Sequence, residues 1–111
     1  MSTLTIYAAA TAASDGSTVP HPVYNARDVE DFTVSADALA GTEEIDVYFE
    51  SGATFIVAKD KDGVAYKLAA TAGLNNGNPL VLKGGLTYQF RKDLTASACG
   101  IYINEGRGVN A

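Results

Sequence analysis

Glycine-containing turns recur about every ten residues from Phe32 onward, and this spacing constrains the fold more than any other feature. The segments between the turns are short, and several alternate apolar with polar residues, as a strand with one buried face does. The clearest is Glu44–Glu50, in which Ile45, Val47 and Phe49 alternate with acidic residues and a tyrosine. No segment is convincing as a full helix, so the pattern predicts an all-β protein.

We expect about eight short strands, arranged as an antiparallel two-sheet sandwich of jelly-roll or immunoglobulin-like type. They lie within residues 3–10, 32–35, 44–50, 54–58, 64–68, 80–82, 86–91 and 98–103. The side chains expected to face inward are Leu4, Ile6, Phe32, Val34, Ile45, Val47, Phe49, Phe55, Val57, Val64, Tyr66, Leu68, Leu80, Leu82, Leu86, Tyr88, Phe90, Ile101 and Ile103. A length of 111 residues suits one domain, 1–111, with one core.

The stretch from Thr11 to Asp31 lacks this alternation and contains the rigid run Pro20–His21–Pro22. Loops of this length are uncommon inside a small domain and are usually functional or disordered. We therefore expect residues 11–31 to form an extended irregular arm or loop, and residues 104–111 to form a loose tail.

The charge balance limits the partners of the chain. Eight basic residues against thirteen acidic ones give a net charge of -5, which repels a polyanion, so we expect no nucleic-acid partner. No apolar run is long enough to cross a membrane, and no membrane partner is expected. A single cysteine, Cys99, cannot form an internal disulfide, and the N-terminus has no basic start of a signal peptide. These features fit assembly in a reducing cytoplasm.

The residues that carry chemistry are too few and too scattered for a catalytic or metal site. His21 and Cys99 are the only residues of their types and lie far apart in the chain. Asp60–Gly63 begins like a calcium loop, but Val64 stands where an oxygen ligand is required, so we expect a charged turn with a left-handed Gly63. No dinucleotide or phosphate-binding motif is present. We expect no catalytic residue, no metal, no cofactor and no enzyme activity.

A contact surface is better supported, because strand alternation turns Tyr7, Tyr48 and Tyr102 away from the core. An outward tyrosine offers a large contact area with a polar tip, which suits a protein interface. The expected interface combines part of the long loop with two strand tyrosines: Pro20, His21, Pro22, Val23, Tyr24, Tyr48 and Tyr102.

Several stretches resemble a known class of protein. They are the Ala/Thr/Ser-rich start at 2–18 and the runs 40–47, 85–92 and 99–102. Together they are similar to small β-sandwich structural proteins of tailed bacteriophages, especially head decoration or cement proteins. The resemblance implies an accessory virion protein, often trimeric, that sits on the outer capsid and bridges neighbouring subunits of the major capsid protein. Such a protein is localised on the capsid surface after assembly in the host cytoplasm.

Two alternatives stay open at this point. A carbohydrate-binding module would stack sugar rings on Tyr7, Tyr48 or Tyr102, although the sequence contains no tryptophan. Another part of the virion, such as a tail, neck or fibre component, is not distinguished from a head protein by the sequence.

Overall fold

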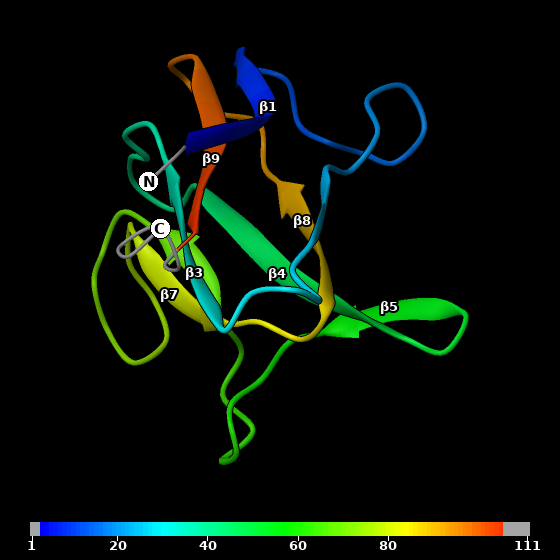
Figure 1. Cartoon of the computed structure of the whole chain (residues 1–111). Helices are drawn as coiled ribbons and strands as arrows, with labels where there is room; N and C mark the ends of the chain where they lie inside the picture. Colours follow the sequence, from blue (N-terminus) through cyan, green and yellow to red (C-terminus); the bar gives the residue numbers. More distant parts are fainter. Residues whose placement is uncertain (1–2, 106–111) are drawn as a thin grey trace.

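The computed structural model describes residues 3–105, which form nine β-strands (Figure 1). The strands are β1 (Thr3–Ala10), β2 (Val23–Asn25), β3 (Asp31–Ala36), β4 (Glu44–Ser51), β5 (Thr54–Val57), β6 (Lys67–Ala69), β7 (Leu80–Lys83), β8 (Thr87–Lys92) and β9 (Cys99–Glu105). No helix occurs among these residues, and therefore none that is long and apolar enough to span a membrane.

The strands form two sheets packed face to face, and every ladder between them is antiparallel. Sheet A has the order β1-β9-β3-β7, and sheet B has the order β2-β8-β4-β5, with β6 also paired to β4. The first and last strands are neighbours, since Thr3 lies opposite Asn104. The prediction of an all-β antiparallel sandwich is confirmed.

The core lies between the sheets and follows the alternation of the sequence. In β4, Ile45 and Val47 are fully buried, and the intervening Asp46 and Tyr48 face outward. Aromatic rings join the two layers: the Phe32 ring meets Tyr24 edge-on with centroids 4.8 Å apart, and meets Tyr88 in the same way at 5.2 Å.

Some residues expected to face inward do not. Leu4 is 43% exposed because β1 is an edge strand, and Leu86 is 37% exposed because it belongs to the link between β7 and β8 and not to a strand. The ladder of β4 and β5 places Phe55 opposite Glu50 and Val57 opposite Tyr48, on the outer face. That strand is apolar on both faces, so its alternation did not fix which face is buried.

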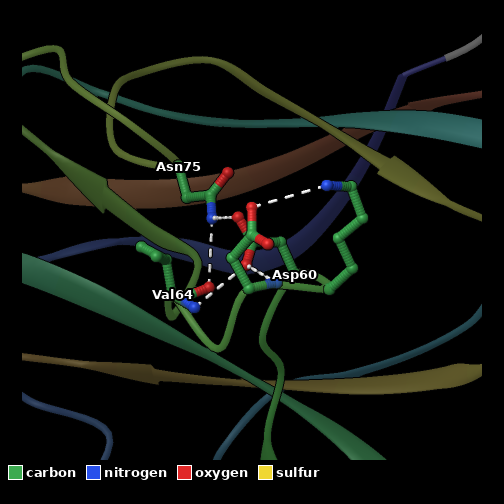
Figure 2. A network of polar contacts seen from close by, with 5 residues as sticks. Asp60, Val64 and Asn75 are labelled. Carbon is green, nitrogen blue, oxygen red and sulfur yellow. Dashed lines mark hydrogen bonds and ion pairs between the residues drawn. The ribbon is translucent and has the colours of Figure 1, made fainter.

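Val64 is only partly buried, because it belongs to a turn and the strand expected at 64–68 begins later, at Lys67. Asp60 organises this turn: its Oδ1 accepts the backbone N–H groups of Asp62 at 2.8 Å and Val64 at 3.0 Å. Gly63 has a φ of 83°, as predicted. Asn75 faces the turn and donates to Asp60 Oδ2 at 2.8 Å and to the Val64 carbonyl at 3.0 Å (Figure 2).

The range expected to be one irregular arm is partly regular. Val23–Asn25 form β2, which pairs with β8, and Ala26 and Val29 are buried beside it. Residues 11–22 form an ordered loop that projects from the sandwich and returns to it (Figure 1). Residues 104 and 105 continue β9, and the rest of the expected tail lies outside the described residues.

Candidate contact surface

The outer face of sheet B brings loop and strand residues into one row. Val23 lies opposite Gln89, Gln89 opposite Tyr48, and Tyr48 opposite Val57, so the row crosses β2, β8, β4 and β5. Directly opposed residues in antiparallel strands share a face. Val23 is 49% exposed and the other three are partly exposed, as is Phe55 next to them. The result is a largely apolar strip on an otherwise acidic protein.

Tyr48 is held in place by its neighbours on β8. The Arg91 guanidinium lies 3.7 Å from the centre of the Tyr48 ring, and Arg91 Nε donates to Gln89 Oε1 at 2.8 Å. A cation over an aromatic face is attracted by the ring electrons. These contacts hold the Tyr48 ring in one orientation on the face of sheet B.

The projecting loop is attached to sheet B through Ser14 and the last residue of β8. Ser14 N–H donates to the Lys92 carbonyl at 3.0 Å, and Lys92 N–H donates to Ser14 Oγ at 2.8 Å. Further along, Phe90 N–H donates to the Pro22 carbonyl at 3.0 Å. These bonds continue the sheet past β2, so the loop has a defined course.

The tip of the loop is a compact turn. Asp15 Oδ1 accepts the N–H groups of Ser17 at 2.9 Å and Val19 at 3.0 Å, and these bonds hold the pKa of Asp15 below its usual value. His21 Nδ1 lies 3.2 Å from Ser14 Oγ. Partial burial, together with the charge of Arg91, lowers the pKa of His21. His21 thus ties the tip of the loop back to its base.

Lys92 is the internal anchor of this region and is only 2% exposed. Its ammonium donates to the carbonyls of Ala12 at 2.8 Å and Asp93 at 3.1 Å, to Thr95 Oγ1 at 3.1 Å, and more weakly to the Thr11 carbonyl at 3.4 Å. Burial lowers the pKa of Lys92. This buried cation joins the start of the loop to the segment after β8.

Tyr7, expected to point outward, has a structural role instead. Its hydroxyl donates to the Ala12 carbonyl at 2.8 Å, and its ring lies 5.5 Å from the Lys92 ammonium and packs on the core. The prediction that Tyr7 points away from the core is therefore wrong, because the loop after β1 folds back over the ring.

The structure brings together only part of the expected interface. Pro20 is exposed, His21 is partly exposed and Val23 is half exposed, all in the strand or loop next to β8. Pro22 is buried, and Tyr24 is only 6% exposed because it alternates inward from β2 onto Phe32. These two expected contact residues belong to the interior of the chain.

Tyr102 lies on the other sheet, where it pairs with Thr5 and Ser35, and so does not share a face with Tyr48. Its hydroxyl donates to Asp37 Oδ2 at 2.8 Å, and Gly100 N–H donates to the same oxygen at 2.9 Å. These bonds lower the pKa of Asp37 and raise the pKa of Tyr102. The Tyr102 hydroxyl is thus used in a hydrogen bond within the chain. Its ring is partly exposed, away from the other residues of the expected interface.

The described residues provide no constellation for metal binding: no three His, Cys, Asp or Glu side chains within 3–105 converge on one point. Cys99 is fully buried, and burial raises the pKa of its thiol, so the reactive thiolate is disfavoured. The carboxylate of Asp60 is used by the turn that it organises.

Comparisons with protein-family models, with curated protein sequences and with solved structures give no match. The geometry itself therefore defines the candidate site, a fixed apolar strip on sheet B bordered by an anchored loop.

Proposed function

We propose that this chain is a non-enzymatic structural protein of a virion, specifically a capsid decoration or cement protein that binds the outer capsid and bridges major capsid subunits. The observation that supports the proposal best is the strip Val23–Gln89–Tyr48–Val57, bordered by Pro20 and His21 of the ordered loop. A surface of this kind is suited to binding another protein by burying apolar area, and such binding requires no catalytic residue.

The proposal includes self-association, with a trimer favoured by the family resemblance. Cementing works by multivalency: a trimer that contacts several capsid subunits at once detaches only when all contacts break. Light scattering on the purified chain gives the oligomeric state, and a trimer is the expected result.

The test is co-sedimentation with capsids assembled from the major capsid protein encoded by the same genome. Deleting the first thirty residues is unsuitable, because it removes β1 and β2 from the two sheets. Tyr48→Ala keeps the core intact and removes the centre of the strip. We expect its capsid affinity to fall about tenfold, as for a central aromatic contact.

Leu74→Ala is the matched control, since Leu74 is 70% exposed and lies outside the strip. It should bind as the unchanged chain does. Equal binding by Tyr48→Ala and the unchanged chain would remove sheet B from the proposal. Attachment to tails or necks alone would move the protein to another part of the virion, and tyrosine-dependent glycan binding without capsid binding would make it a carbohydrate-binding module.

A further inference from the structure

The N-terminal segment, residues 3–14, is attached to the sandwich mainly along one strand. Its β1 is an edge strand of sheet A and pairs only with β9. None of the β1 side chains is buried, although Ile6 and Tyr7 are partly buried and pack against the core. The segment therefore covers one side of the core without forming its centre.

The N-terminal segment has one further attachment, at the end of β8. Lys92 Nζ donates to the Ala12 carbonyl at 2.8 Å, and Lys92 N–H donates to Ser14 Oγ at 2.8 Å. Within the described chain, the hydrogen bonds of the segment to other parts reach residues 92–105, and one more contact joins Ser14 to His21. A second copy of the chain offers the same residues 92–105, so the segment can make the same bonds there.

The link between this segment and the sandwich, residues 15–21, is the projecting tip of the loop (Figure 1). Its compact turn depends on Asp15 Oδ1, which accepts two backbone N–H groups, and on the contact of His21 with Ser14. Straightening the tip breaks bonds that are local to it and leaves the bonds to residues 92–105 intact. Fully extended, the tip spans up to about 23 Å, at about 3.3 Å per residue.

The sequence of the tip favours the straightened form. Val19 precedes Pro20 and His21 precedes Pro22, and a residue before proline is restricted to extended backbone conformations. The compact turn, in contrast, places Gly16 at a φ of 85°. Two rigid prolines therefore lower the entropy that the tip loses when it becomes straight.

The N-terminal segment can also approach another copy without electrostatic repulsion. Residues 3–14 contain no charged side chain, although the whole chain has a net charge of -5. Because like-charged copies repel each other, an uncharged segment docks between them at the lowest electrostatic cost.

We propose that residues 3–14 are exchanged between copies of this chain, so that β1 of one copy pairs with β9 of the next. The exchanged segment keeps its ladder with β9 and its bonds to Lys92, and the two forms differ mainly in the tip. Three copies that each pass the segment to the next close into a ring, as a trimer requires. The inference rests on the self-association in the proposed function, and capsid binding through Tyr48 is separate from it.

The experiment places a disulfide across the ladder that is exchanged. Thr3 lies opposite Asn104 in the pairing of β1 with β9, and opposed residues of antiparallel strands have the Cα separation that a disulfide needs. The double variant Thr3→Cys with Asn104→Cys is oxidised with copper phenanthroline and run on a denaturing gel without reductant. We expect covalent oligomers, because the bond joins two copies. Cys99 is fully buried and is retained.

The matched control is Thr33→Cys with Asn104→Cys. Thr33 lies opposite Asn104 in the ladder of β3 with β9, which the exchange leaves within one copy. Its disulfide should therefore form inside a single chain. The oxidised control should run as a monomer on the denaturing gel, while light scattering of the native protein shows an oligomer.

Two results would overturn the proposal. If Thr3→Cys with Asn104→Cys gives only monomer on the gel while light scattering shows an oligomer, the copies associate without exchanging the segment. If light scattering shows a monomer at every concentration, both the exchange and the proposed trimer are wrong. Capsid co-sedimentation then still tests the strip around Tyr48 by itself.

Discussion

Among single residues, Lys92 differs most from expectation, because a charged lysine side chain is expected at the surface and this one is buried. It follows Tyr88 and Phe90 on the same face of β8, so alternation alone directs it inward. Its charge argues for the surface, and it is absent from the inward set expected from the sequence. The acceptors that compensate the charge come from residues 11–12 and 93–95, which local sequence reasoning does not bring together.

Replacing the buried cation tests how much it stabilises the fold. Lys92→Met keeps most of the apolar stem but leaves the Ala12 and Asp93 carbonyls and the Thr95 hydroxyl with one partner fewer. We expect a loss of about 2–4 kcal/mol in the free energy of unfolding, measured by urea denaturation. Lys83→Met, at an exposed lysine, should stay within about 0.5 kcal/mol. Similar values for both variants would contradict the role assigned to Lys92.

His21 makes the loop sensitive to acid. His21 Nδ1 lies 3.2 Å from Ser14 Oγ, and burial of the ring together with the charge of Arg91 disfavours its protonated form. The pKa of His21 is below the ordinary 6.5, so the unfolded chain binds the proton more readily. The contribution of His21 to the stability of the fold is therefore complete above about pH 6.5. It is lost as the pH falls through the pKa that His21 has in the folded chain.

The measurement compares the unchanged chain with His21→Gln at about pH 7 and about pH 5. Carboxylates such as Asp15, Asp37 and Asp60 titrate in both proteins, so their contribution largely cancels. The unchanged chain should lose more stability between the two pH values than the variant does. Parallel losses would show that the histidine does not couple the loop to pH.

At the scale of elements, β2 was missed because three residues give too short an alternation to be recognised. Its central residue, Tyr24, is buried while Val23 and Asn25 on either side are exposed, so the pattern is present but ambiguous. What makes it a strand is the ladder with β8, a long-range pairing. The Asp60 turn, by contrast, was predictable because its Asp and Gly positions are local signals.

The link between β7 and β8 depends on two glycines with different requirements. A Cβ on Gly84 would lie 1.7 Å from the Val29 carbonyl oxygen, whereas a Cβ on Gly85 meets nothing within 4 Å. Gly84 N–H also donates to the Glu30 carbonyl at 2.8 Å, so the backbones cannot separate without losing that bond. This close contact holds β7 and β8 against the segment between β2 and β3.

We expect Gly84→Ala to lower the free energy of unfolding by about 2–4 kcal/mol, because the loop must move or break its bonds. Gly85→Ala, at a φ of 87°, should cost about 1–2 kcal/mol from backbone strain alone. Urea denaturation of both variants checks the order. A larger loss for Gly85→Ala would mean that strain, and not close approach, governs this turn.

At the scale of the whole molecule, the sandwich could be predicted because alternation and turn spacing are properties of the sequence itself. The sequence could not predict where one sheet extends beyond the other, because that depends on how the two layers are offset. Ile56 is an apolar residue left partly exposed by this offset.

The order of strands in sheet A also bears on how the chain is made in a cell. β9 lies between β1 and β3, and both pair with it. A ribosome releases the N-terminal part first, so β1 waits through the synthesis of about ninety residues for the strand that pairs with it. Sheet B needs nothing beyond β8. Both sheets therefore depend on a late strand, sheet B on β8 and sheet A on β9, so neither is complete until the last part of the described chain has been made.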